Sequence, residues 1–335
     1  MRSELQTRTS FILSLSCQLA MAMSILTGSS TAQTFSVVET SGAADPAPEI
    51  NRVQTSPPIA YAALSQPVAD DVIQPYRRGF YQGAEVTGGT ILDLGDRNGG
   101  LDVTFKETRL GFAIPLGSFQ NLLIASPFFR ATQLRGPPEV DVPANLFDTG
   151  VTLLNRKQWS DRWSTLTIVT PTVRSDFTTS QDAMRVFGLG LIQWQITRTF
   201  QWSAGVLYLD REDVGVLPAV GFTWEPTPAW RLDGMLPRPR LHHRLWKDGG
   251  RGEGWVSVGA SIGGNSWAVT RSDGSSDLLT LREFRLLADY EVIRPERQGW
   301  TISSGLSLGR QVEYERDDTE LDLDDAIFLE AAWRF

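Results

Sequence analysis

The sequence predicts an all-β protein, an antiparallel up-and-down transmembrane β-barrel of about fourteen strands that follows a cleaved signal peptide. From residue 79 to residue 335, β-prone segments alternate with turns rich in Gly, Pro, Asp and Asn. Tryptophan residues flank every second turn, and the last predicted strand ends in phenylalanine. These features are typical of a barrel in the outer membrane of a Gram-negative-type bacterium.

The first 32 residues resemble a secretory signal. Arg2 and Arg8 precede an apolar stretch at residues 11–26, and Ser30-Thr31-Ala32 matches a small-residue cleavage site. The apolar stretch is too short and too rich in serine for a membrane-spanning helix. We therefore expect an exported chain that is cleaved near Ala32 and that enters a membrane with strands.

The chain contains one cysteine, Cys17, which lies inside the predicted signal. The mature chain is therefore expected to lack a disulfide and a thiolate. A lipoprotein signal is the alternative for Cys17, although Ser14-Leu15-Ser16 matches that motif poorly. The whole chain has a net charge of −8 and no basic block, so nucleic acid is not expected as a partner.

Residues 33–78 are rich in Pro, Ala, Ser and acidic residues and show little hydrophobic periodicity. Such a composition buries too little apolar surface to order itself. We predict a flexible periplasmic segment here. A plug that occupies the barrel lumen is the alternative.

The barrel region, residues 79–335, contains fourteen predicted strands, and most are long enough for a tilted crossing of about 9–11 residues. With both termini on the periplasmic side the number must be even. It is even only if residues 235–239 form a tight outer turn, and twelve strands are the alternative to fourteen. The expected ranges are 79–92, 101–115, 121–134, 145–158, 163–177, 185–196, 200–211, 215–225, 230–236, 239–247, 255–269, 278–291, 300–314 and 326–335.

The connections between strands alternate in length. One set is short and flanked by tryptophan, and the other is longer and polar, as expected for periplasmic turns and outer loops. The longer set comprises 93–100, 135–144, 178–184, 270–277 and the acidic stretch 315–325. Because this acidic stretch lacks the glycine spacing of an EF-hand loop, we predict a solvated loop there.

Indole rings prefer the headgroup level of a membrane, so the turn-flanking tryptophans predict an aromatic girdle. In the last strand, apolar residues occupy every second position up to Phe335, which resembles the signal recognised by the outer-membrane insertion machinery. Outer-membrane lipid and that machinery are therefore expected partners. The candidate interface and assembly residues are Trp159, Trp163, Trp194, Trp202, Trp224, Trp230, Trp255, Trp300, Trp333 and Phe335.

Two late strands alternate between apolar residues and small, polar or charged residues. A polar inner face is wrong for the core of a soluble barrel and suits a hydrated lumen. The candidate lumen-facing residues are Glu283, Arg285, Asp289, Glu291, Gln311 and Glu313. Because this set is mostly acidic, an open lumen is expected to favour cations modestly.

Two groups of charged residues, Asp210 with Arg211 and Arg238 with Arg240, fall at the predicted outer rim. Charges at a pore mouth set ion selectivity or bind an anionic solute. Binding of lipid headgroups, or simple solvation of the rim, are the alternatives.

No catalytic, metal or cofactor site is predicted. Two G-x-S-x-G matches, at Ser261 and Ser307, lie inside predicted strands and lack the strand–turn–helix context of a nucleophile elbow. The two histidines, His242 and His243, are adjacent and would face opposite sides of a strand, so they cannot form a metal site together.

Four segments resemble the recurring signatures of a bacterial family known only as a domain of unknown function, predicted to form outer-membrane β-barrels. They are residues 205–211, 217–221, 236–239 and 263–268. The resemblance covers about residues 79 to 335, and it implies a fold and a location but no substrate and no catalytic residue.

The sequence therefore leads to a functional hypothesis with two rivals. Eight strands leave an interior filled by side chains and 16–18 leave an aqueous channel, so fourteen strands predict a narrow or plugged pore. The leading hypothesis is a pore or transporter for small solutes. The rivals are a non-transporting structural or adhesive barrel and, more distantly, a hydrolase embedded in the barrel.

Overall fold

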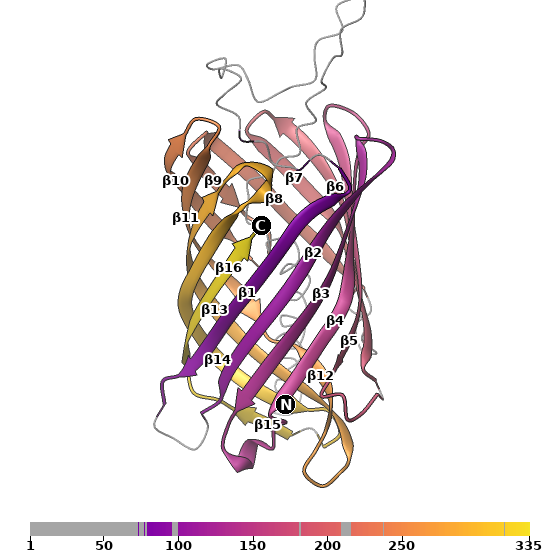
Figure 1. Ribbon diagram of the computed structural model, residues 1–335, viewed down its shortest axis with the longest axis vertical. Coiled ribbons are helices and arrows are strands. Elements are labelled where there is room, and N and C mark those ends of the chain that lie inside the picture. The colour runs from indigo at the N-terminus through magenta and orange to yellow at the C-terminus, as the bar shows by residue number, and fades with distance from the viewer. Residues whose placement is uncertain are drawn as a thin grey trace, which may run out of the picture.

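The computed structural model describes residues 73, 77, 79–95, 100–180, 182–208, 216–236, 238–317 and 319–335. In these residues sixteen strands form one sheet, and fourteen of them close into an antiparallel ring of tilted strands (Figure 1). The predicted fold class is therefore confirmed. The predicted signal at 1–32 and most of the predicted segment 33–78 lie outside the described residues.

Each strand in the ring pairs with its neighbour in sequence from β1 to β11, and the ring continues through β13, β14 and β16 back to β1. The strands are β1 (Tyr81–Asp93), β2 (Asp102–Ser118), β3 (Asn121–Arg135), β4 (Asn145–Gln158), β5 (Trp163–Ser175), β6 (Met184–Thr197), β7 (Phe200–Tyr208), β8 (Val216–Thr227), β9 (Trp230–Asp233), β10 (Arg240–Asp248), β11 (Gly252–Gly263), β12 (Ser266–Thr270), β13 (Ser276–Ile293), β14 (Gly299–Tyr314), β15 (Thr319–Asp322) and β16 (Ala326–Arg334). The described part of the chain also contains two short 3-10 helices, η2 (Pro138–Val140) and η3 (Pro295–Arg297).

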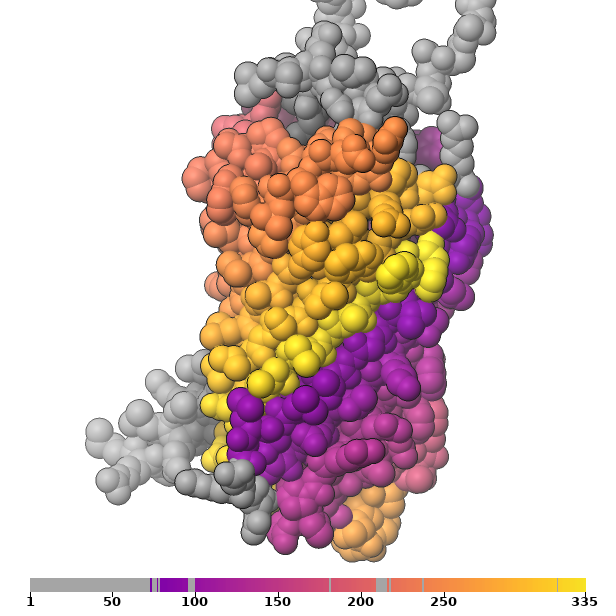
Figure 2. All heavy atoms as spheres, turned by 60° about the vertical axis from the view of Figure 1, so that its left-hand side comes forward, coloured from indigo at the N-terminus to yellow at the C-terminus, as the bar shows by residue number. Residues whose placement is uncertain are grey.

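The C-terminal strand β16 closes the ring. It pairs with β1 from Glu85↔Arg334 to Asp93↔Ala326 and with β14 along its other edge. Beyond the strand, the backbone N–H of Phe335 donates to the carbonyl oxygen of Ala84 at 2.9 Å. Figure 2 shows this seam, where the yellow C-terminal strand lies directly beside the indigo first strand.

Two short strands, β12 and β15, extend the wall at the end opposite the C-terminus (Figure 1). The sequence predicted a single strand at 255–269, but Gly264 has φ of +109° and separates β11 from β12. Both segments pair with β13. The predicted acidic loop 315–325 contains β15, which pairs with β14. These differences leave the ring of fourteen unchanged.

The outer surface of the barrel is apolar and its inner surface is largely polar. On β14, Ile302 and Leu306 are exposed, whereas Ser303 and Ser307, each the next residue along the strand, are buried. This pattern is the reverse of a soluble protein and matches a barrel surrounded by lipid. No helix in the described residues is long and apolar enough to cross a membrane.

The tryptophans beside the short turns form a belt at one end of the barrel. Cross-strand pairs such as Trp163↔Trp194, Trp194↔Trp202 and Trp300↔Trp333 connect them around the wall. Trp163 and Trp194 stack with ring centroids 5.5 Å apart. Trp159, Trp224, Trp230 and Trp333 are also exposed, as expected for a girdle.

Trp255 does not belong to this belt, so its predicted interface role is wrong. It is only 7% exposed and alternates with outward-facing residues such as Val256 and Val258 on β11. Its side chain therefore faces the interior, with the Arg244 guanidinium 5.6 Å from the ring centroid. The position beside a turn was correctly predicted. Because side chains alternate between the two faces of a strand, however, this indole ring points into the barrel.

The barrel interior holds two apolar clusters. The larger, here called the outer core, fills the end that carries β12 and β15, and it comprises Ile91, Leu101, Val103, Phe105, Leu134, Val140, Leu146, Trp267, Val269, Leu279, Leu281, Leu287, Val312, Tyr314, Leu323, Ala326 and Phe328. The smaller lies against β5–β8 and includes Leu166, Ile168, Phe187, Leu189, Leu191 and Leu207. The outer core closes its end of the lumen with packed side chains.

A closed ring of this kind resists unfolding by detergent because no strand edge is left at the seam. We therefore expect the protein to migrate differently on a denaturing gel before and after boiling. An identical mobility in both samples would contradict the closed barrel.

Candidate solute-binding cavity

A cavity of about 240 Å³ lies inside the barrel, next to the outer core. Eight arginines and six carboxylates contribute to its wall, together with threonine, serine and a few apolar residues. The arginines are Arg109, Arg130, Arg174, Arg238, Arg240, Arg282, Arg285 and Arg310, and the acids are Glu85, Glu107, Asp148, Glu283, Asp289 and Glu330. The wall is therefore charged and has a small excess of positive groups.

On one side of the cavity, strands β2 to β5 place two carboxylates among arginines. Glu107 accepts from Arg109 at 2.7 Å and lies 3.2 Å from Arg130. Asp148 is 3.2 Å from Arg174 and also accepts from the indole N–H of Trp267 at 3.1 Å. These side chains converge because alternate residues of each strand face inward.

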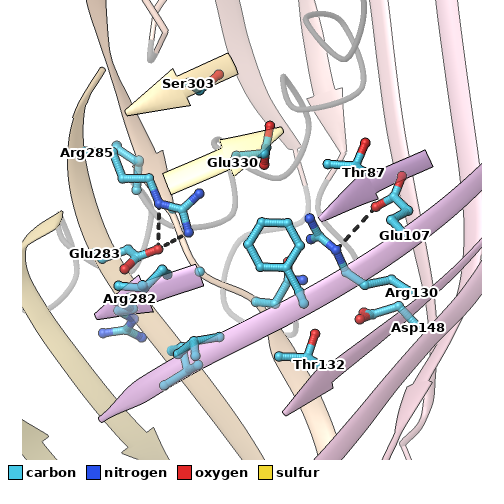
Figure 3. Close-up of a pocket in the computed structure, with 18 of the residues that line it drawn as sticks. Thr87, Glu107, Arg130, Thr132, Asp148, Arg282, Glu283, Arg285, Ser303 and Glu330 are labelled. Atoms are coloured by element: carbon cyan, nitrogen blue, oxygen red, sulfur yellow. Dashed lines mark hydrogen bonds and ion pairs between the residues drawn. The ribbon is translucent and has the colours of Figure 1, made fainter. Parts of the chain in front are cut away.

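On the other side, strands β10, β11, β13 and β14 build a second network. Glu283 accepts from Arg285 and from the hydroxyl of Ser307, and Arg310 lies 3.7 Å away. Asp289 accepts from Arg240 and, at 2.8 Å, from the hydroxyl of Ser257. Figure 3 shows the Glu283–Arg285 pair facing the Glu107–Arg130 pair across the cavity.

Two carboxylates of the wall, Glu85 and Glu330, form no hydrogen bond or ion pair with any residue that the structure describes. Glu330 lies between the two arginine networks in Figure 3, close to Thr87 and Ser303. Arg130 and Arg285 act on its charge through space. Its carboxylate therefore faces the cavity with its acceptor positions available.

The predicted lumen-facing residues divide into two groups. Glu283, Arg285 and Asp289 line the cavity, and Glu291 is buried and binds Arg334 further toward the tryptophan belt. Gln311 and Glu313 alternate with the buried Arg310, Val312 and Tyr314. Gln311 binds Asp322 and also contributes to the cavity wall, whereas Glu313 binds Arg282 and does not contribute to that wall.

The prediction that Glu313 faces the lumen is therefore wrong, whereas Gln311 contributes to the cavity wall as predicted. The reason is a β-bulge on β14, where Gly309 has φ of +54° and the register shifts against Arg282 and Phe284 of β13. One extra residue reverses the faces of every following position. The expected preference for cations, which relied on a mostly acidic set, is not supported by a wall in which arginines are the majority.

The predicted outer rim is also corrected. Arg238 and Arg240 line the cavity inside the barrel, because β9 is only four residues long and β10 begins at Arg240, opposite Gly259 in the middle of the wall. Their hairpin therefore ends well before the outer loops. Asp210 and Arg211 lie outside the described residues.

The histidines and serines do not assemble a nucleophile. His242 faces inward, 3.3 Å from Asp233, and its pairing partner on β11 is Ser257. The Ser257 hydroxyl, however, donates to Asp289. Ser261 and Ser307 lie inside strands β11 and β14, as predicted.

Among the described residues, no group of three or more His, Cys, Asp or Glu side chains is arranged to hold a metal ion. The arginine–carboxylate networks of β2 to β5 were missed at the sequence level. The spacing of Glu107 and Arg109, two residues apart in a strand, could have indicated them by the same alternation that was used for β13.

Comparison with known proteins gives only distant similarity. No protein-family model and no curated protein matches the chain. Among solved structures, the translocator domain of autotransporter NalP from Neisseria meningitidis is 12% identical, with 76% of this chain and 88% of that chain covered and a TM-score of 0.27.

Two other solved structures come from Pseudomonas aeruginosa. OccK11 (OpdR) is 8% identical, with 79% of this chain and 100% of that chain covered and a TM-score of 0.29. The siderophore receptor PirA is 9% identical, with 78% and 81% covered and a TM-score of 0.22. Similarity at this level transfers no function to the chain.

Proposed function

We propose that the protein is an outer-membrane barrel that binds a small solute in its lumen and controls the solute's passage. The observation that carries this proposal is the charged cavity beside the outer core. Arginine retains donor positions when it binds one carboxylate, because its guanidinium has five N–H groups. The wall can therefore bind a solute that brings acceptors of its own.

The same geometry argues against a pore that is always open. The outer core places packed apolar side chains between the cavity and the outer loops, and Leu101, Leu146 and Leu279 within it are fully buried. Packed interiors of this kind leave few voids as large as a water molecule. Passage through that end requires a rearrangement.

We expect small and infrequent conductance steps in planar bilayers, with a preference for anions over cations. Arginines are in excess at the cavity wall, and charge in a narrow, low-dielectric passage biases which ions enter. Replacing Arg130 and Arg285 together with glutamine should shift the reversal potential toward cation preference. Lys106→Gln, on the exposed face of β2, is the matched control and should leave it unchanged.

A non-conducting structural barrel is the second candidate, and the filled outer core is the observation that favours it. Bilayer recordings separate the two functions. A protein that passes the boiling test but never conducts, and whose cavity binds no solute, would support the structural barrel and contradict solute passage.

A further inference from the structure

Among the residues that the structure describes, the barrel wall is interrupted between β8 and β11. Strand β9 pairs with β8 as far as Thr223, and the next backbone hydrogen bond, from the Gly234 N–H to the Phe222 carbonyl at 2.8 Å, is the last one, whereas β8 continues to Val216. Likewise β10 ends opposite Gly259, whereas β11 continues to Gly263. Beyond the interruption the wall closes again, because β12 reaches β5 and Asp176 N–H donates to the Ala268 carbonyl at 3.1 Å.

This interruption lies at the level of the lipid. On β11, Ala260 and Ile262 pair with Leu286 and Phe284 of β13, whose side chains are exposed on the apolar outer face. On the β8 side, Val220 is likewise exposed. Open sheet edges are not tolerated against hydrocarbon, and irregular backbone occurs at this depth only where it is buried or lines a water-filled cavity.

The interruption leads to the charged cavity. Its inner rim consists of residues that line that cavity, namely Arg238, Arg240 and the stretch 262–265. The short loop between β9 and β10 carries an apolar and a charged side chain: Leu236 is 68% exposed, and Arg238 contributes to the cavity wall. Arg238 lies near Arg240 and Arg285 and also near Glu330 and Asp289, so this rim presents several guanidinium groups among carboxylates.

The size of the cavity limits what it can hold. Sites for complete small-molecule ligands usually measure about 300–1,000 Å³, and this cavity measures about 240 Å³. A polar head group with a few methylene groups fits, but a long chain does not. The outer core blocks the path toward the loops, so an attached chain would leave through the interruption into the bilayer.

From this geometry we infer that the interruption between β8 and β11 is a lateral portal, and that the ligand is a single-chain amphiphile with an anionic head group. The arginines at the rim bind the head group, and the chain extends past Leu236 into the lipid. This inference rests on the proposed function, because it names the class of solute that the cavity takes.

The head group is tested with the purified full-length barrel and a fluorescent long-chain carboxylate. Laurate should displace this probe, whereas lauryl alcohol and acetate should not, since one lacks the charge and the other the chain. Dodecyl phosphate, compared with laurate, shows which anionic head is preferred. Arg238→Gln should weaken binding at least tenfold, and Arg251→Gln, in an exposed turn that does not contribute to the cavity wall, should change it little.

The portal is tested with a long-chain carboxylate that carries a photoreactive group at the end of its chain. Label should accumulate on the portal segments, 216–236 and 258–262, and not on Ile302 and Leu306, which are similarly exposed on β14. Retention of the boiling-dependent gel shift shows that each variant is folded.

The portal inference would be overturned if laurate and lauryl alcohol bound equally, or if the label were distributed uniformly around the barrel. If short-chain anions still bound in the cavity or crossed the barrel, the proposed function would stand without the portal. If no anion bound and no current appeared, both would fail.

Discussion

Replacing Trp333 and Phe335 together with serine, or deleting Phe335, is expected to leave most of the chain outside the membrane as aggregate or degraded protein. Strand β16 is the closing strand and pairs with both β1 and β14. Both aromatic side chains are about half exposed on the lipid-facing side. Losing a large apolar side chain from such a surface costs about 1.5–3 kcal/mol, and Phe335 also contributes the last backbone hydrogen bond to β1.

The control removes the same residue types from the same end of the barrel. Phe119 and Trp159 lie in turns at the tryptophan belt and are more exposed than Trp333 and Phe335, but neither belongs to the closing strand. A double Phe119→Ser, Trp159→Ser variant should assemble. The measurement is the membrane-bound, boiling-sensitive fraction; equal losses in both double variants would show that the C-terminal strand has no special role.

The features that could be predicted from the sequence depend on the period of two in a strand. Glu283, Arg285 and Asp289 face inward as predicted because alternate side chains of one strand must face opposite sides. The number of strands in the ring followed from turns that Gly and Pro mark locally. The tryptophan belt followed from the same turns, with Trp255 as the exception.

The features that could not be predicted depend on single-residue irregularities. Gly309 creates a bulge that turns Glu313 away from the cavity, yet it sits in a segment where small residues already alternate. Nothing local distinguishes it from Gly305. In the same way, the turn before Arg240 was assigned to the outer rim because every hairpin was assumed to cross the whole membrane.

Other features depend on contacts between residues far apart in the chain. Trp267 was the one tryptophan away from the turns, and it binds Asp148 across 119 positions of sequence inside the outer core. The acidic stretch 315–325 was expected to be solvated, but Asp317 binds Arg271 and β15 forms within it. Local patterns carry no information about such partners, so the closed outer end was not foreseen.

Replacing Arg271 with alanine is expected to open that end. Arg271 binds three carboxylates from three segments: Asp141 at 3.2 Å, Asp277 at 3.3 Å and Asp317 at 2.9 Å. Its guanidinium also lies 4.2 Å from the ring centroid of Tyr314, a fully buried member of the outer core. One side chain therefore joins three outer segments to the packed interior.

The size of the effect follows from the burial of Asp277, whose side chain is 1% exposed. Removing one partner of a buried ion pair costs about 3–5 kcal/mol, whereas the more exposed Asp141 and Asp317 contribute less. Since about 1.4 kcal/mol corresponds to a factor of ten, we expect at least a tenfold rise in the frequency of open conductance states. Arg251→Ala, in an exposed turn at the opposite end, should not alter it.

The frequency with which the outer end opens is expected to increase as the pH falls. Hydrogen bonds from Thr319 and Arg271 hold the pKa of Asp317 below its usual value. A lowered pKa in the folded state gives stability that is present above the unfolded value of about 3.9 and is lost as the pH falls through the folded value. The wild-type outer end should therefore stay closed from neutral pH down to about pH 4 and open more often below it.

In the Arg271→Ala variant this acid-induced opening should be weaker, because the pairing that protonation would disrupt is already absent. Wild-type and variant recordings with equal opening frequencies at neutral pH would show that the outer core alone holds this end closed.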